Sequence, residues 1–271
     1  MGARMFLKRL ISEMRFITEL WKMNLASALE YRANFITQSI GMLINDAIFF
    51  VFWVLFFDCF KSIKGWGLQD MVLLFSIITT GFGVGMALFG NSMKVAEIIA
   101  QGRLDYYLVL PRNVLIHILA SRSMISAYGD IFFGVLSFFF FTGPVTAEKT
   151  AIWLIASLLS GTVLVCAASL FGCLSFFIGN ATTLAGQATN AMMILSVYPD
   201  TIFQGGVRFL MYTLFPAALI GALPYRAVRS LDWQSLVLLA CGALFFAILL
   251  TAVFNAGLRR YESGSALNVN M

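Results

Sequence analysis

The long apolar runs of this chain constrain its fold more than any other feature, because several are long enough to cross a lipid bilayer. A helix that crosses about 30 Å of hydrocarbon needs about 20 apolar residues. Runs that meet this length lie at 35–57, 71–89, 114–141, 151–178 and 233–258. A further run, 181–203, also qualifies, although it is polar for a membrane helix. We therefore predict an all-α polytopic membrane protein with six transmembrane helices, and we see no internal domain boundary in residues 1–271.

Composition and charge agree with a membrane location. The chain is 60% hydrophobic and 11% charged, whereas a soluble domain carries roughly 25% charged residues. With six spans and the N-terminus inside, twelve of the 18 Lys and Arg residues fall on the cytosolic side, as the positive-inside rule requires. The net charge of +5 is therefore a topology signal, and we expect no nucleic-acid partner and cytoplasmic N- and C-termini.

The segment 205–229 is too short and too broken to be a regular span. Its apolar part, 209–223, covers only about 22 Å as a helix at about 1.5 Å per residue. Pro216 interrupts it and Pro224 follows it. We predict a re-entrant pair of short helices before the last span, which is tolerated only where protein or a cavity covers the freed backbone groups. A seventh span here would leave the charge count unchanged, so charge does not decide the number of spans.

The N-terminal residues 5–25 predict an amphipathic helix. Apolar residues recur there at three- and four-residue steps, with basic and acidic residues on the other face. Such a helix suits the membrane surface, where it lies in contact with lipid. Packing of this helix on a soluble partner is the alternative, and the two can coexist.

Residues 93–113 form a polar island between two apolar runs. Met93–Gln101 predicts a short helix that Gly102 ends, since glycine tolerates a positive φ at a helix C-terminus. Pro111 prevents a helix from continuing through the island. This is where the chain could meet a soluble partner; the alternative is an ordinary loop that orients its flanking helices.

Motifs for catalysis and for nucleotide or metal binding are missing. The chain has no G-x-x-x-x-G-K-[S/T] loop, a single histidine and no H-E-x-x-H or G-x-S-x-G motif. The spacing of its four cysteines fits no metal site. We predict no catalytic residue, no metal site and no enzymatic activity.

Polar residues inside the predicted spans are candidates for a translocation pathway. They are Asn45, Asp46, Asp130, Gln187 and Asn190. A charge in the bilayer costs a few kcal/mol on insertion scales, so it usually faces a cavity or a partner. A pathway for a cationic or amphiphilic substrate is one interpretation. The alternative for each aspartate is a structural contact with Arg, Asn or Ser of a neighbouring helix. Gln187 and Asn190 suit either a dimer interface or the pathway.

Glycines in the second predicted span favour close helix packing. Gly81 and Gly85 have the small-x-x-x-small spacing that lets two membrane helices approach. We expect packing here, and the pattern does not identify the partner helix.

The run Glu97–Asp105, EIIAQGRLD, with Leu110-Pro111 after it, resembles a stretch of one branch of ABC-2 permeases. Two further stretches resemble the same branch. One contains Tyr198-Pro199, Ile202-Phe203, Arg208 and Pro216, and the other is the closing stretch Gly257–Gly264. With the predicted topology, the chain resembles over nearly its whole length the small six-span permease of an ABC-2 type ATP-binding-cassette exporter, in a branch that includes viologen and drug exporters.

This resemblance implies a bacterial plasma (inner) membrane protein in which two like or related permease subunits bind two separate ATPase subunits. ATP and Mg²⁺ would then bind the partner ATPase, and this chain would need no cofactor. Residues 93–105 would be the coupling helix, with Glu97, Gly102, Arg103, Leu104 and Asp105 at the ATPase. Residues 5–25 would be the connecting helix, and 205–229 would cap the exit. Relatives are linked to export of drugs, toxic cations or lipid-like molecules, so a small hydrophobic, amphiphilic or cationic substrate is implied.

Two rival functions remain open. An ion-coupled secondary transporter would want inverted repeats and a charged relay at mid-membrane, and the missing repeat argues against it. A membrane scaffold that anchors a cytosolic complex without transport would use the same polar island.

Overall fold

The computed structural model describes residues 2–262, with side chains from Ile11 onward. Apart from an isolated bridge between Ile63 and Trp66, the regular structure of this range is helical. The helices are α1 (Gly2–Glu30), α2 (Arg32–Cys59), α3 (Leu68–Phe89), α4 (Val95–Ala100), α5 (Asp105–Leu108), α6 (Val114–Ala120), α7 (Ala127–Phe141), α8 (Ala147–Gly172), α9 (Ser175–Ile178), α10 (Thr182–Ser196), α11 (Gly205–Tyr212), α12 (Ala217–Ile220), α13 (Ala222–Ser230) and α14 (Trp233–Leu258), with 3-10 turns η1 (Gly90–Lys94) and η2 (Asp200–Ile202).

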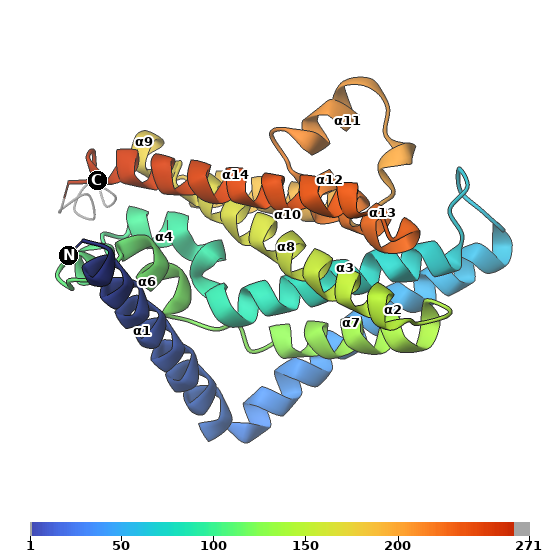
Figure 1. Cartoon of the computed structure of the whole chain (residues 1–271), viewed down its shortest axis with the longest axis horizontal. Coiled ribbons are helices and arrows are strands. Elements are labelled where there is room, and N and C mark those ends of the chain that lie inside the picture. Colours follow the sequence, from blue (N-terminus) through green and yellow to red (C-terminus); the bar gives the residue numbers. More distant parts are fainter. Residues whose placement is uncertain (1, 263–271) are drawn as a thin grey trace.

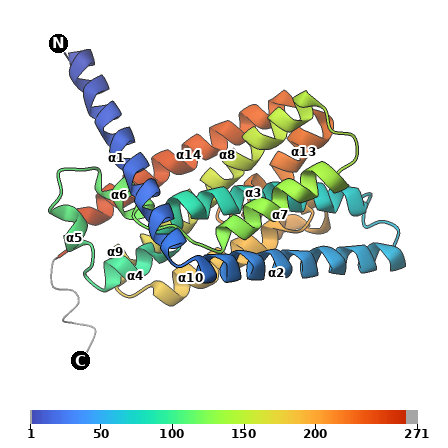
Figure 2. The same cartoon turned by 90° about the horizontal axis from the view of Figure 1, so that it is seen from below.

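The long helices form an elongated bundle around α3. Helices α7 and α8 pack on α3, α14 packs on α8, and α2 lies against α7 (Figures 1 and 2). We call the end of the bundle where α1 begins and α14 finishes the terminal end; α4, α6 and α9 lie there too (Figure 1). The opposite, far end holds α13 and the loop after α2 (Figure 1).

Within residues 2–262, four helical stretches are long and apolar enough to cross a membrane. They are α2, Leu68–Ala100, Ala147–Ile178 and α14. A fifth is obtained if α11 and Ala217–Ser230, which are bent by 62° at the break between them, count as one span. The all-helical membrane fold is therefore confirmed, while the six predicted spans are not all present as long helices.

The predicted third span, 114–141, is wrong as a single helix. It is two helices, α6 and α7, with residues 121–126 between them. The freed backbone groups of this break bond to the end of α3: Gly90 N–H donates to Arg122 O, and Met124 N–H donates to Met86 O. The predicted span 181–203 is likewise not one helix: α10 covers 15 of its residues, and the 3-10 turn η2 follows Pro199.

Close approach of α3 to α8 is set by glycine. An added Cβ at Gly81 would lie 2.5 Å from Ser157 O, and one at Gly161 would meet the Gly81 carbonyl oxygen. An added Cβ at Gly85 would lie 3.0 Å from a Val165 methyl group. The packing role predicted for Gly81 and Gly85 is confirmed, and α8 is the partner helix.

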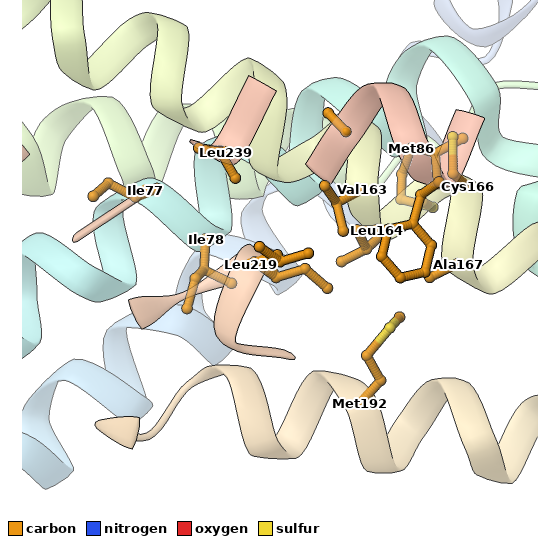
Figure 3. Packing of buried hydrophobic residues seen from close by; sticks show 14 of the residues in the cluster. Ile77, Ile78, Met86, Val163, Leu164, Cys166, Ala167, Met192, Leu219 and Leu239 are labelled. Carbon is orange, nitrogen blue, oxygen red and sulfur yellow. The ribbon is translucent and has the colours of Figure 1, made fainter. Parts of the chain in front are cut away.

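The hydrophobic core lies where α3 and α8 meet α14 and α12. Figure 3 shows a part of this core. Its labelled side chains are Ile77, Ile78 and Met86 of α3, Val163, Leu164, Cys166 and Ala167 of α8, and Met192, Leu219 and Leu239. The core is continuous along α3, and a smaller separate cluster is formed by Met211, Ala217, Ala218 and Ala222 of α11 to α13.

Helix α1 spans the predicted residues 5–25 and is longer than predicted. It leaves the bundle at an angle and meets α2 in a sharp corner (Figure 2). Its Trp21 Nε1–H donates to Leu88 O at 2.8 Å, and Asn24 Nδ2–H donates to Ala120 O at 3.0 Å. These bonds fasten one face of α1 to the ends of α3 and α6.

Candidate functional site

The polar island folds as predicted around a short helix. Residues 93–100 are helical, first as η1 and then as α4. Gln101 caps α4, and Gly102 follows with φ of +70° while its N–H donates to Ile99 O at 3.1 Å. Glycine adopts this left-handed conformation without a side-chain clash, so the predicted helix and its glycine end are both confirmed.

Helix α4 is mostly buried, which the sequence did not show. Val95, Ile98 and Ile99 are each at most 3% exposed, in contact with α8, α9 and α10. Leu104, predicted at the partner interface, is fully buried in the core. A partner can therefore touch only the other side of the island.

That other side combines an ion pair with exposed apolar side chains. Glu97 and Arg103 pair at 2.7 Å, with about a third and a half of their side chains exposed (35% and 49%). Beyond them the chain exposes Tyr106, Leu108, Val109 and Leu110, of which Val109 is 79% exposed. We call Glu97, Gln101, Arg103, Tyr106 and Leu108–Leu110 the island surface. Apolar groups clustered on an exposed loop make this surface a candidate interaction site.

Asp105 lies beside the C-terminal end of α14. Burial raises the pKa of the Tyr261 phenol to about 12, and the Asp105 carboxylate adds to the shift. Tyr261 also packs edge-on against Phe176, next to α9. The polar island, α9 and the end of α14 therefore form one connected unit at the terminal end.

The predicted pathway residues do not form one site. Asp46 and Asp130 are 3% and 2% exposed, and their carboxyl groups interact with one another between α2 and α7. Asn45 lies beside Asp46 in sequence but is exposed on the surface of α2. The structure thus pairs the two aspartates and leaves Asn45 out.

Gln187 and Asn190 share an exposed face of α10. They lie there with Thr183, while Ala185 and Met192 on the opposite face are buried against the bundle. We call this row of exposed polar side chains the polar stripe of α10. The exposed surface of α2 differs from it, because α2 exposes an isoleucine at every fourth residue.

Asp200 is a buried carboxylate that the sequence analysis missed. It is fully buried in η2, and its Oδ2 accepts hydrogen bonds from Arg208, Tyr212 and Arg226. These donors come from α11 and α13, so Asp200 ties both halves of the broken segment to the end of α10. The one available signal was an acidic residue beside Pro199 and within eight residues of an arginine.

A second carboxylate fixes α13 to the start of α3. Asp70 Oδ1 lies 3.0 Å from Arg229 and accepts a 2.8 Å hydrogen bond from the Tyr225 hydroxyl. The Tyr225 ring stacks on Trp66 at 4.0 Å between centroids. Segment 205–229 is thus closed at the far end by two acidic anchors, one of them deeply buried.

Asp200→Asn is expected to loosen α11 and α13 without unfolding the bundle. The change removes the charge that two guanidinium groups share, and both are partly solvated (46% and 41% exposed side chains), so the loss is about 1–3 kcal/mol. Hydrogen exchange should accelerate in 205–230 and stay unchanged in α3 and α8. Glu148→Gln, which alters an exposed carboxylate in the first turn of α8, is the control. Unchanged exchange in 205–230 would show that Asp200 does not hold this segment.

Comparison with known proteins adds the family. A model of the ABC-2 family of transporter proteins matches residues 43–265, from the middle of α2 to beyond α14. The chain belongs to the ABC-2 transporter family. No curated protein and no solved structure gives a significant match. As an ABC-2 protein it is a multi-pass membrane component of a transporter, and permeases of this family generally work with ATP-binding subunits.

The matched range includes the polar island, the α10 stripe and the Asp200 anchor. It leaves out α1, whose contacts with α3 and α6 come from the structure. Every residue predicted for partner coupling therefore lies within the ABC-2 portion of the chain.

Proposed function

We propose that this ABC-2 protein is the permease subunit of an ATP-binding-cassette exporter. It would form the pathway for a small hydrophobic or amphiphilic compound, while two separate ATPase subunits bind and hydrolyse ATP with Mg²⁺. The observation that carries this proposal is the island surface, an exposed apolar and charged patch on a rigid unit at the terminal end. A soluble partner that docks there can push on α4 and, through it, on α8, α9 and α10.

The docking geometry supports coupling of a partner to the membrane helices. Residues buried on the inner side of α4 contact α8, α9 and α10, and Leu104 is fully buried in the core. A displacement of the island surface is therefore transmitted by close-packed side chains, which deform little. Of the residues named from the sequence, Glu97, Arg103 and Gly102 would act at or next to the interface, and Leu104 would act by packing.

A second permease subunit would cover the polar stripe of α10. Contact of Gln187 and Asn190 with lipid would be costly, because amide groups find no hydrogen-bond partners in hydrocarbon. In a pair of like or related permeases these stripes would face each other across a polar pathway. This proposal uses both interpretations of the stripe, the interface and the pathway, because in such a pair they coincide.

Two hollows beside α1 support an amphiphilic substrate. One, of about 470 Å³, is lined by apolar side chains of α1, α3, α8 and α14, including Trp21 and Leu250. The other, of about 450 Å³, is polar and is lined by Asn34, Lys94 and Arg122 among others. Drug-sized ligands occupy pockets of roughly 300–1,000 Å³. Two basic residues in the polar hollow favour a compound whose head group is neutral or anionic over the cation considered from the sequence.

The proposed topology keeps six crossings in a bacterial inner membrane. They are α2, α3, α7, α8, α10 and α14, with α11 to α13 as a re-entrant outer segment and both termini in the cytoplasm. At about 1.5 Å per residue, the 15-residue helices α7 and α10 each cover only about 22 Å, so they would cross with help from their flanking turns or from local thinning of the bilayer.

Purification from native membranes under mild detergent tests the proposed function. A stoichiometric ATPase subunit that elutes with this chain, and whose hydrolysis depends on it, is the expected result. A chain that elutes alone and stays stable in several detergents would contradict the exporter assignment. It would favour an ion-coupled transporter or a membrane scaffold instead.

Cross-linking tests the second permease subunit. Asn190→Cys, in a background with Cys59→Ser and Cys241→Ser because these two cysteines are exposed, should give a disulfide-linked dimer in membranes on mild oxidation. Ile48→Cys, at an exposed position of α2, is the matched control and should stay monomeric. Equal dimer formation by both variants, or by neither, would argue against α10 as the interface.

A further inference from the structure

The Asp46–Asp130 pair is an unusual feature of the bundle. Both carboxyl groups are almost completely buried, and they interact with each other across the contact of α2 with α7. The neighbouring contacts are tight: an added Cβ at Gly129 would meet Ser39 O, and Phe50 packs on Phe133. The two aspartates are therefore held face to face by the packing around them.

Neither carboxyl group has a basic partner in the described part of the chain. Both are absent from its ion pairs, and the Oδ2 atoms of Asp46 and Asp130 are buried without a hydrogen-bond partner. The structural contact with a neighbouring Arg, Asn or Ser, which the sequence left open, is not what the structure shows.

The other titratable groups of α2, α3 and α7 lie near helix ends. They are Arg32, Asp58 and Cys59 on α2, Tyr128 on α7 and Asp70 on α3. On α1, Glu30 lies next to the start of α2. Asp70 is occupied by Arg229 and Tyr225 at the far end. The strongest charge that each carboxyl of the pair can feel is therefore that of the other.

Two ionised carboxylates cannot share such a place. Like charges in a buried site repel strongly, and one of the two keeps a proton. Asp130 lies in the first turn of α7, where the helix N-terminus favours one remaining negative charge. Burial and mutual repulsion thus keep a proton on the pair, and the helix end favours a single remaining charge.

We propose that Asp46 and Asp130 form a proton-binding site in the membrane domain, with one proton shared between the two carboxyl groups. The shared proton would join α2 to α7. Helix α2 is the most exposed of the long apolar helices and meets the bundle chiefly through α7. Loss of the proton would leave two repelling charges at that contact and release α2.

The polar hollow opens onto the same contact of α2 with the turn before α7. Its lining includes Gln38 on α2 and Ser123 and Ile125 in the turn before α7. Gln38 lies about two helical turns before Asp46, and Ser39 Oγ donates to Ile125 O where α2 meets this turn. This proposal does not depend on an ATPase partner or on the substrate.

Infrared spectroscopy of the full-length protein in lipid nanodiscs tests the site. The wild-type protein should show the C=O band of a protonated carboxyl group at neutral pH, and alkaline titration should remove it. Asp46→Asn should remove the whole band, because the new amide can donate a hydrogen bond to an ionised Asp130 at the N-terminal end of α7 in place of the shared proton. Asp130→Asn should do the same, and Asp58→Asn, which changes an exposed carboxylate at the end of α2, should leave the band intact.

The band intensities distinguish the alternatives. If each single variant removes only half of the band, the two aspartates are separate neutral acids and the shared proton is disproved. A band that no variant changes also overturns the proposal. If Asp130→Asn does not fold, Asp46→Asn alone still decides between loss of the whole band and loss of half.

Heat inactivation supplies a second readout. The wild-type protein should inactivate faster as pH rises through the loss of the shared proton, while Asp46→Asn should lose this pH dependence. Deprotonation would leave two repelling charges at the contact of α2 with α7, so stability falls as the proton is lost. Protection by Na⁺ or K⁺ at fixed alkaline pH, with no effect of pH itself, would identify a metal-cation site and overturn the proton site.

Discussion

Gly102→Pro is expected to abolish ATPase association while leaving the membrane helices folded. Proline cannot adopt the φ of +70° found at Gly102, because its ring holds φ near −65°. It also removes the N–H that donates to Ile99 O. The chain after α4 must then leave in another direction, which displaces Arg103 and the apolar residues that follow. We expect the affinity for the partner to fall by about 100-fold or more, since central interface groups contribute about 2 kcal/mol or more each.

The far end of the bundle provides a control of the same local geometry. Gly143 has φ of +79° and follows Thr142, which caps α7 much as Gln101 caps α4. Gly143→Pro therefore introduces comparable backbone strain away from the island surface. Co-purification and ATPase turnover should survive in Gly143→Pro and be lost in Gly102→Pro. Equal loss in both variants would show general misfolding and remove the coupling assignment.

A surface variant separates contact from backbone geometry. Val109 is 79% exposed, so Val109→Glu should not disturb the fold, yet it places a charge in the middle of the exposed apolar run. If Val109→Glu binds the ATPase as well as the wild-type protein does, the apolar half of the island surface is not part of the interface.

The sequence predicted local structure well where one residue decides it. Gly102 ends α4 because glycine adopts a positive φ without a side-chain clash. The polar island was predicted because it interrupts two long apolar runs. The break within segment 205–229 was predicted from Pro216 for the same kind of reason. Such features depend on a few neighbouring residues, and they need no knowledge of the remaining fold.

Burial and pairing were not predictable, because they depend on helices far apart in the chain. Leu104 looked like part of an exposed motif, but it packs into the core that α4 shares with α8 to α10. Asp200 has donors up to 26 residues away, and Asp46 meets a carboxylate 84 positions later. The break between α6 and α7 is stabilised by bonds to the end of α3, and its one sequence signal was the polar stretch Ser121–Ser123.

Gly161→Val is expected to be the most destabilising single change in the bundle. The added Cβ would overlap the Gly81 carbonyl oxygen and lie 3.2 Å from the Gly81 Cα. Backbone cannot rotate away as a side chain can, so α3 and α8 would have to separate along their buried contact. Because these two helices carry most of the core, we expect a loss of about 4 kcal/mol or more. The protein should be recovered as aggregate, as judged by size-exclusion chromatography in detergent.

Alanine substitutions at Gly81, Gly85 and Gly41 test this prediction as a graded series of stabilities. Gly81→Ala should be severe, because its Cβ meets the Ser157 carbonyl oxygen at 2.5 Å. Gly85→Ala should be mild, because its nearest neighbour at 3.0 Å is a methyl group of Val165 that can move. Gly41→Ala, on α2 with no atom within 4 Å of the added Cβ, should be neutral or stabilising by up to about 1 kcal/mol through helix propensity. A flat series, with all three variants equally stable, would mean that α3 and α8 do not approach through Gly81. The expected order, with Gly81→Ala less stable than Gly85→Ala, would show that a backbone contact at Gly81 sets the approach of α3 to α8. The two glycines of the motif differ in which α8 atoms an added Cβ would meet.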